Sequence, residues 1–394
     1  MESFFGLTKE ELKNRGGLTT AEEIFQQPTV WKETLSIIID KKDELSSFLK
    51  VVMKEEKLKI IFAGAGTSGY IGDTLIPYLK KVLKGVKVES VHTTDIVSYP
   101  EIYLDKDTPT LLFSFARSGN SPESVAAVEL AEDLVDNLYQ IIITCNQNGK
   151  LAQNAGSEKT KLILLPEESH DKGFAMTSSF TSMLLSTLLL FNLENVDEKL
   201  DEIETIIKNA KNILTNTEII EELSASDFQK IIYLGSYSFH GLAKEAALKI
   251  LELSAGKIIT RYDTPLGFRH GPKSIIDKNT LIVFFLPSNK HARKYEMDLL
   301  RELAVEKDGY KTFVISGKKD TEIEKISDYS VFIELDNNKI DESFNSLNYI
   351  LYAQVLALLE SLKHRICPDN PSPDGSVNRV VKGVKIHPYI KKSI

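Results

Sequence analysis

The sequence predicts an α/β protein built from two tandem three-layer αβα domains, each with a five-stranded parallel sheet. Short β-branched runs alternate with longer helical patterns along the chain, as in parallel sheets covered by helices on both faces. The chain also repeats itself: KIIFAGAGTSGYIGD from Lys59 resembles KIIYLGSYSFHGLAKE from Lys230, an offset of 171 residues (230 − 59). A length of 394 residues suits two or three domains.

Three further pairs of segments support a duplicated domain. The pairs are TLLFSFARSGNS from Thr110 with TLIVFFLPSNKH from Thr280 at an offset of 170, residues 141–144 with 313–316 at 172, and LILLP from Leu162 with VFIEL from Val331. Chance similarity between ordinary α/β strands is the alternative. A nearly constant offset over four segments favours duplication.

Each copy contains five strand candidates, which the apolar runs define. Those of the first copy lie near residues 59–63, 86–92, 110–115, 140–145 and 161–165. Those of the second copy lie near residues 230–234, 258–262, 280–286, 311–316 and 329–335. Ligands bind beyond the carboxyl ends of parallel strands, so we expect the functional site in the loops that follow them.

These patterns divide the chain into five segments. They are an N-terminal helical arm (1–50), a first domain (51–195), a charged helical linker (196–225), a second domain (226–365) and a C-terminal tail (366–394). In the arm, Thr19-Thr20-Ala21-Glu22-Glu23 offers a helix capping box, and residues 30–53 have a helical pattern. In the tail, turn formers precede a basic end.

The composition limits the classes of function. A net charge of −8 and a pI near 5.6 argue against a nucleic-acid partner, because such binding needs Lys and Arg at the phosphates. Cys145 and Cys367 lack metal-ligand spacing, so we expect neither a disulfide framework nor a metal site. The apolar run 183–193 is too short to span a membrane. The first residues carry no secretory signal, and we expect a cytoplasmic protein.

The first candidate loop, GAGTSG, follows the strand at 59–63. Gly64, Gly66 and Gly69 satisfy the G-x-G-x-x-G spacing that holds a pyrophosphate at a helix N-terminus in dinucleotide-binding enzymes. Thr67 and Ser68 add hydroxyls beside free backbone N–H groups, which suits a terminal phosphate equally well. The glycine spacing alone leaves both ligands open.

The second candidate loop, SFARSGNSPES from Ser114 to Ser124, follows the strand TLLF. Ser118, Ser121 and Ser124 surround Gly119 at a helix start, a geometry that suits an anion. Helix capping explains the serines of one such loop equally well. Two hydroxyl-rich loops on adjacent strand ends favour a phosphate.

NAD is the weaker candidate. It requires an acidic residue about 20 residues beyond the glycines, and Glu89 and Asp95 match that position only loosely. The repeated loop, residues 235–238, also lacks the complete glycine spacing. We therefore expect no cofactor.

A helix expected at residues 241–255 carries three charged side chains on one face. Glu245, Lys249 and Glu252 are spaced by four and three residues, which aligns them at about 3.6 residues per turn. A solvated salt bridge explains such a pattern in an arbitrary helix, but this helix begins at a strand end and can line a cleft. His270, in the turn RHGP, is either a packed or a functional loop histidine.

These motifs, in this order, resemble the two-domain form of the sugar isomerase (SIS) superfamily of phosphosugar proteins, whose domains are flavodoxin-like. The motifs are GAGTSG, RSGNSPES, EAALKILELSAG and RHGP, and the resemblance runs from about residue 50 to the end. RSGNSPESVAA and CPDNPSPDGSVNRVVKGV are most similar to the galactosamine-6-phosphate deaminase/isomerase family, also described as tagatose-6-phosphate ketose/aldose isomerases. The chain is also similar to the isomerase half of glutamine-dependent glucosamine-6-phosphate synthase.

The resemblance implies a phosphate-binding set. The hydroxyls that match it are those of Thr67, Ser68, Ser118 and Ser121. Ala116 and Arg117 replace a serine and a glutamine of the family, so we expect the Arg117 guanidinium to help hold the phosphate. Met176 replaces a small polar residue near the sugar.

The resemblance also implies catalytic residues. Glu252 matches the carboxylate that moves a proton between C1 and C2, and His270 matches the histidine that opens the sugar ring. Lys249 and Glu245 match their companions. In related isomerases the histidine of the HGP turn reaches the neighbouring subunit's site, so we expect a homodimer or higher oligomer with shared sites. The C-terminal tail is expected near the active site.

This set of residues suits an aldose-to-ketose conversion by C2 proton transfer. With an amine at C2, the same transfer gives a ketimine, from which water releases ammonia. We predict conversion of galactosamine-6-phosphate to tagatose-6-phosphate and ammonia. The alternatives are a simple aldose/ketose-6-phosphate isomerase, a glucosamine-6-phosphate deaminase, an NAD-dependent dehydrogenase and a non-catalytic phosphosugar sensor.

Overall fold

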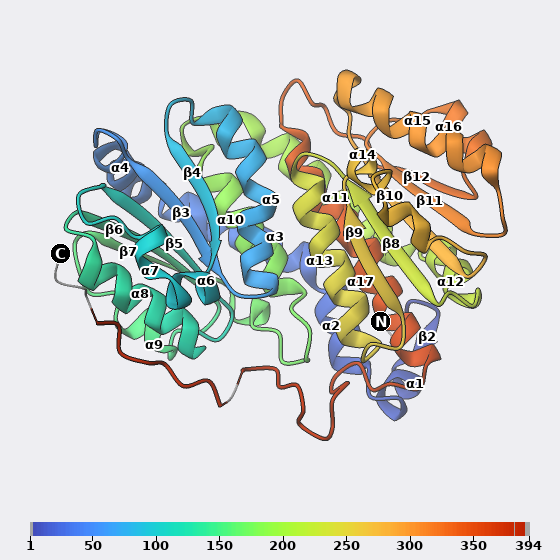
Figure 1. Ribbon diagram of the computed structural model, residues 1–394, viewed down its shortest axis with the longest axis horizontal. Helices are drawn as coiled ribbons and strands as arrows, with labels where there is room; N and C mark the ends of the chain where they lie inside the picture. Colours follow the sequence, from blue (N-terminus) through green and yellow to red (C-terminus); the bar gives the residue numbers. More distant parts are fainter. Residues whose placement is uncertain (1–2, 382, 391–394) are drawn as a thin grey trace.

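The computed structural model describes residues 3–381 and 383–390 and contains two α/β domains side by side (Figure 1). Each domain holds a five-stranded parallel sheet. Apolar cores lie on both faces of the first sheet, because Ile60 and Phe62 belong to one core and Ile61 and Ala63 to another. The predicted fold class is confirmed.

Both sheets have the same topology. Their strand orders, β4-β3-β5-β6-β7 and β9-β8-β10-β11-β12, are both the 2-1-3-4-5 order of flavodoxin-like folds. The strands of the first copy are β3 (Lys59–Gly64), β4 (Lys87–His92), β5 (Thr110–Ala116), β6 (Leu138–Thr144) and β7 (Thr160–Leu164). Those of the second copy are β8 (Lys230–Gly235), β9 (Ile259–Asp263), β10 (Thr280–Leu286), β11 (Lys311–Ser316) and β12 (Tyr329–Phe332). The registers agree too, since Lys59 lies opposite Thr110 and Lys230 opposite Thr280.

The ten predicted strands are all present, with small shifts at their ends. β12 stops at Phe332 rather than at residue 335, and β5 continues through Ala116. The second candidate loop therefore begins at Arg117 and not at Ser114. The hairpin of β1 (Ser3–Phe4) and β2 (Leu7–Thr8) was not predicted, because two-residue strands show no periodicity.

Helices connect the strands in each domain (Figure 1). Those of the first domain are α5 (Thr67–Val82), α6 (Thr93–Ser98), α7 (Pro100–Tyr103), α8 (Pro122–Leu134), α9 (Lys150–Gln153) and α10 (Ser178–Leu190). Those of the second are α13 (Ser238–Leu253), α14 (Pro265–Phe268), α15 (Lys290–Glu306), α16 (Thr321–Ile326) and α17 (Ser346–Lys363). Short 3-10 turns are η1 (Glu167–Ser169), η2 (Leu193–Asn195), η3 (Asp197–Lys199), η4 (Pro272–Ile275) and η5 (Glu342–Asn345). All of α10, and all of α17 except Lys363, is buried.

The first fifty residues form helices that pack on both domains. The helices are α1 (Lys9–Asn14), α2 (Leu18–Phe25), α3 (Gln27–Asp40) and α4 (Lys42–Val52). α3 packs against α10 of the first domain, and α2 packs against α17 of the second.

The capping box predicted at residues 19–23 was wrong. α2 already begins at Leu18, and its N-cap, Gly17, has no side chain to cap with. The backbone N–H groups of Thr19 and Thr20 instead donate to the carboxylate of Asp369, at 3.2 and 2.8 Å. A distant tail residue thus supplies the cap that the local sequence was expected to supply.

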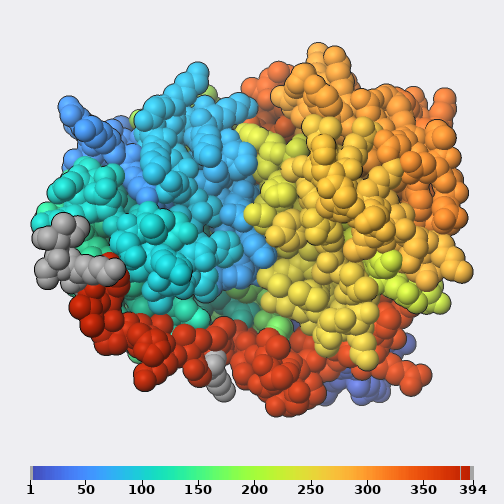
Figure 2. All heavy atoms as spheres, in the orientation of Figure 1, coloured from blue at the N-terminus to red at the C-terminus, as the bar shows by residue number. Residues whose placement is uncertain are grey.

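Two helices join the domains, α11 (Leu200–Thr215) and α12 (Glu218–Ala225), and both pack against α17. The C-terminal segment then runs along one edge of the molecule, from the second domain back to the first (Figures 1 and 2). No helix in the described part of the chain is long and apolar enough to cross a membrane.

The two domains meet through α5 and α13, which pack against each other. Gly241 permits this close approach, because a Cβ at this position would overlap the backbone of Asp73 and Thr74. Lys244 on α13 pairs with Asp73 on α5 at 2.7 Å. Equivalent helices of the two copies thereby bring the first-copy loops beside the face that carries Glu245, Lys249 and Glu252.

Candidate active site

A pocket of about 360 Å³ lies beyond the carboxyl ends of β3 and β5. Five parts of the chain line it: the N-terminus of α5, Thr94 on α6, the loop from β5 to α8, the segment before α10, and the C-terminal tail. One residue of the second domain, Glu252 on α13, completes the wall. Among the lining residues are Thr67, Ser68, Arg117, Ser118, Ser121, Glu123, Phe174, Met176, Glu252 and Arg379.

The loop after β3 presents its hydroxyls through a turn that needs glycine. Gly66 has φ 55° and ψ −128°, a conformation that L-residues rarely adopt, and α5 starts directly after it. Thr67 and Ser68 occupy the first turn of this 16-residue helix and face the pocket. The positive end of the helix dipole and two hydroxyls therefore meet at one point, which favours an anion.

The loop after β5 brings a second helix N-terminus to the pocket. Ser121 is the N-cap of α8, and Pro122 is its first residue. A hydrogen bond holds the loop in place: Asn146 Nδ2, just after β6, donates to the carbonyl of Ser118 at 2.8 Å. Arg117 is buried, and its guanidinium donates to the carbonyl of Phe174 at 3.1 Å. Hydroxyls and a cation thus converge from the β5 side as well.

A buried ammonium links the two domains behind the pocket. Lys249 Nζ lies 2.6 Å from Glu252 Oε2, 3.3 Å from Glu245 Oε1 and 3.0 Å from Thr67 Oγ1. The Lys249 and Glu245 side chains are 1% and 0% exposed, whereas that of Glu252 is 26% exposed. Of the three charged residues, Glu252 is therefore the one that a bound molecule can touch.

The charges of this group are set by burial and by each other. Burial raises the pKa of Glu245 to about 7, although Lys249 opposes the shift. Burial alone would lower the pKa of Lys249, but the carboxylates of Glu245 and Glu252 outweigh it and raise that pKa. Lys249 is thus a cation at neutral pH and holds the Glu252 carboxylate in place.

His270 lies outside this pocket. It follows α14 and the turn residue Arg269, its backbone N–H donates to Gly267 at 2.9 Å, and its side chain is exposed. The structure therefore brings together eight of the nine predicted site residues, two of them behind the wall rather than on it, and leaves His270 on the surface.

Sequence reasoning did not identify the tail residues that line the pocket. Val377, Asn378, Arg379 and Val381 cover it from the C-terminal segment, and Phe174 lines it from the segment before α10. Neither segment is helix or strand, so no periodicity marks them. The family-like motif CPDNPSPDGSVNRVVKGV and the basic end of the tail led us to expect the tail near the site, but neither signal singled out a residue within it.

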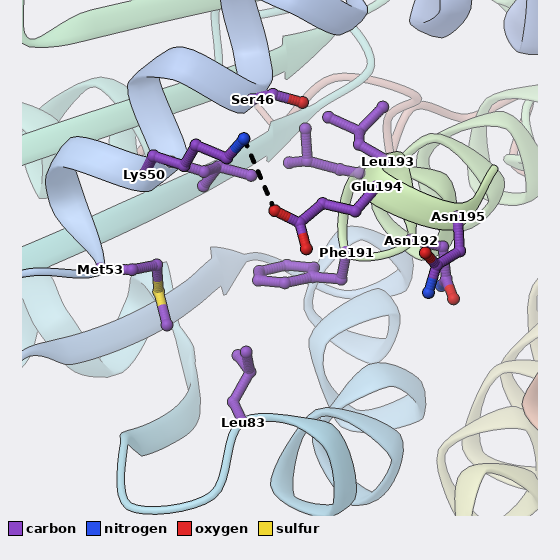
Figure 3. A pocket seen from close by; sticks show the side chains of 11 residues that line it. Ser46, Lys50, Met53, Leu83, Phe191, Asn192, Leu193, Glu194 and Asn195 are labelled. Atoms are coloured by element: carbon purple, nitrogen blue, oxygen red, sulfur yellow. Dashed lines mark ion pairs between the residues drawn. The ribbon is translucent and has the colours of Figure 1, made fainter.

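A second hollow, of about 310 Å³, lies at the opposite end of the first sheet (Figure 3). Met53 precedes β3, and Leu83 follows α5, so the hollow sits at the amino ends of the strands. Lys50 and Glu194 face each other across it at 3.7 Å, and both side chains are largely exposed. Parallel sheets bind ligands at the other edge.

Two features bear on cofactors. Among the described residues, no cluster of three or more His, Cys, Asp or Glu side chains is arranged to hold a metal ion. Glu89, the loose match for a ribose-binding acid, pairs with Lys59 at 2.8 Å and Lys87 at 3.0 Å within the sheet. Its carboxylate is therefore engaged away from the glycine loop.

Known proteins resemble the chain over nearly its full length. The SIS domain family matches residues 52–193. The D-galactosamine-6-phosphate deaminase AgaS of Shewanella sp. (strain ANA-3) is 40% identical over 390 residues, which cover 98% of this chain and 96% of that protein. The chain belongs to the AgaS family. The predicted resemblance is confirmed.

Two solved structures extend the match to three dimensions. A protein of Clostridium novyi NT is 49% identical, with a TM-score of 0.96, 99% of this chain covered and 100% of the other. The tagatose-6-phosphate ketose/aldose isomerase of Escherichia coli is 39% identical, with a TM-score of 0.85, 95% of this chain covered and 97% of the other. The chain therefore shares its two-domain architecture with these two proteins.

We expect the first-copy loops of this AgaS family member to bind the anion. Ser68→Ala combined with Ser118→Ala removes two donors that face the pocket, and each hydrogen bond to a charged group is worth about 1.5–3 kcal/mol. KM for a sugar phosphate should rise at least tenfold, measured by steady-state kinetics on folded protein. Ser288→Ala, at the position in the second copy that corresponds to Ser118, is the matched control and should leave KM unchanged. An unaltered KM in the double variant would remove this assignment.

Proposed function

We propose that the chain is a D-galactosamine-6-phosphate deaminase that releases ammonia and forms tagatose-6-phosphate. The observation that carries the proposal is the pocket itself, in which the hydroxyl-lined helix ends of one copy face the Glu252 carboxylate of the other. The relatives of Shewanella sp. (strain ANA-3) and Escherichia coli, both named D-galactosamine-6-phosphate deaminase, support it. A non-catalytic sensor has no need for a carboxylate held by a buried ammonium.

In this proposal the phosphate binds between the N-termini of α5 and α8, and the sugar carbons extend toward α13. Thr67, Ser68, Ser118 and Ser121 supply hydroxyl donors, and Arg117 supplies a cation. The two helix N-termini hold the phosphate at a fixed position. The length of the sugar chain between the phosphate and C2 then determines how close C1 and C2 come to Glu252.

Glu252 then acts as the base. It removes the C2 proton of the open-chain aldehyde and returns it to C1, while O1 gains a proton and the amine loses one. The products of this step are a hydroxymethyl group at C1 and a ketimine at C2. Addition of water at C2 and departure of the nitrogen as ammonia give the ketose. Lys249 orients the Glu252 carboxylate, at 2.6 Å, and stabilises negative charge that develops nearby. A plain aldose isomerase uses the same steps without loss of nitrogen.

Substrate choice separates the alternatives. We expect ammonia release from galactosamine-6-phosphate to exceed that from glucosamine-6-phosphate, and a 6-phosphate sugar without the amine to release none. Coupled detection of ammonia measures all three. Equal rates with both amino sugars, or interconversion of aldose and ketose without ammonia, would replace the proposed activity by one of the alternatives.

Glu252→Gln tests the assigned base, because the amide keeps the shape and removes the basicity. We expect kcat to fall by about 10²–10⁴, the usual contribution of a positioned base. Exchange of the C2 proton with deuterated solvent, followed by NMR, should stop. The exposed Glu204→Gln is the matched control. Exchange that continues near the parent rate would assign the base to another group.

We further propose a cytoplasmic homodimer or higher oligomer in which His270 serves a neighbouring subunit. His270 is exposed and absent from its own pocket, which supports this arrangement. The surface around the edge strand β9 also carries exposed apolar side chains, those of Leu251, Ile259, Tyr262 and Leu266. Such a surface is typical of a protein interface.

Mixing two inactive variants tests the shared site. His270→Ala and Glu252→Gln each inactivate every homodimer, but a mixed dimer keeps one intact composite site if the histidine crosses over. Random exchange of subunits should restore roughly a quarter of the parent activity, because half of the dimers are mixed and each has one intact site of two. Mass spectrometry of the exchanged dimers is the control. Exchanged dimers without activity would contradict the shared site.

A further inference from the structure

The C-terminal tail delivers a second arginine to the phosphate end of the pocket. Arg379 lines the pocket together with Arg117. The two residues are in direct contact, because the Arg117 guanidinium donates to the backbone carbonyl of Arg379 at 2.9 Å. The tail and the β5–α8 loop thus form one continuous wall at this point.

Both guanidiniums are held by backbone carbonyl groups rather than by carboxylates. Arg117 donates to Phe174 and to Arg379, and Arg379 donates to Gly173 at 3.1 Å and to the carbonyl of Asp171. Neither guanidinium forms an ion pair with a carboxylate anywhere in residues 3–381 and 383–390. Carbonyl groups orient the two cations without neutralising them.

Two of the nearby acids, Asp171 and Glu23, accept hydrogen bonds from backbone N–H groups. Asp171 accepts the backbone N–H groups of Thr177, Ser178 and Ser179 and so caps α10. Glu23, from α2 of the arm, accepts the backbone N–H groups of Lys172 and Gly173. Burial and the neighbouring Asp171 raise the pKa of Glu23, although its backbone hydrogen bonds and the Arg117 charge oppose the shift. Glu123 also lines the pocket, and it pairs with neither arginine.

The pocket wall therefore brings two guanidinium groups together where the tail meets the β5–α8 loop. Burial and the neighbouring Arg117 lower the pKa of Arg379, and burial with both arginines lowers the pKa of His170, as expected where like charges are brought together. A divalent anion relieves this repulsion, and a sugar phosphate is such an anion near neutral pH.

We propose that Arg379 is a further substrate-binding residue, which forms with Arg117 a two-guanidinium site for the dianionic phosphate group. The proposal rests on the proposed function and deepens it, since it assigns the tail to phosphate binding. The hydroxyls at the helix ends then hold one side of the phosphate, and the two arginines hold the other.

Binding of inorganic phosphate to the full chain, measured by calorimetry in a phosphate-free buffer, tests this site without turnover. Arg379→Met keeps most of the packing and removes the charge, and Kd should rise about tenfold or more. Arg379→Lys keeps the charge but loses the fork that binds two carbonyls, and its Kd should lie clearly closer to the parent value. The exposed Arg301→Met is the matched control and should not change Kd.

Steady-state kinetics should show the same ranking of the Arg379 variants as the phosphate Kd values. KM for galactosamine-6-phosphate should rise in Arg379→Met while kcat changes less than about threefold, since this residue lies at the phosphate end. A phosphate Kd within twofold of the parent in Arg379→Met would overturn the proposal, and so would equal losses in the Met and Lys variants, because a purely structural latch depends on the fork and not on the charge. A chain that binds phosphate through Arg379 but releases no ammonia would contradict only the proposed function.

Discussion

The site depends on one buried cation, the ammonium group of Lys249. It lies on a helix of the second domain, touches the Thr67 hydroxyl of the first, and separates two carboxylates that would otherwise repel each other. A buried charge is tolerated only when it is paired, so Glu245 and Glu252 are as necessary to Lys249 as it is to them. Removal of one partner from such a group typically costs about 3–5 kcal/mol. The geometry of the site therefore depends on the packing of α5 against α13, because that packing brings Thr67 to Lys249.

Duplication explains how this contact arose between equivalent elements, and the copies have since diverged. Gly66 and Tyr237 occupy corresponding positions and share nearly the same backbone angles, φ 55° and ψ −128° against φ 59° and ψ −133°. In the second copy a tyrosine adopts this conformation, which costs on the order of 1–3 kcal/mol of folding free energy. The backbone N–H of Ser288, the counterpart of Ser118, donates to the carboxylate of Glu342. An internal carboxylate thus occupies the second copy where the first presents an open anion site.

Much of this arrangement follows from the sequence, because strands and repeats leave periodic signals. The offset of about 171 residues predicted two matching sheets. The strand registers match as well, since Lys59 lies opposite Thr110 and Lys230 opposite Thr280. The spacing of Glu245, Lys249 and Glu252 predicted a shared helix face, although not that the face would be buried against Thr67. Burial depends on a partner helix, which no local pattern reports.

The remaining features come from contacts between segments far apart in the chain. Asp369 caps α2 across some 350 residues, so the local capping pattern at Thr19 gave the wrong start. Arg379 reaches the pocket along an irregular tail, where neither helical nor strand periodicity exists. The role of His270 at a neighbouring subunit's site was inferred from the family resemblance alone. Its exposure depends on how the chain folds around it, which the local sequence does not report.

The most direct test of the account is a crystal structure with a non-reacting open-chain ligand, 2-amino-2-deoxygalactitol 6-phosphate. The account predicts that the phosphate lies between the first turns of α5 and α8, in contact with Ser68 and Ser118, and that C2 lies within about 3.5 Å of a Glu252 carboxylate oxygen. A phosphate bound at the loops of the second copy, or a C2 atom remote from Glu252, would contradict the division of roles between the two domains.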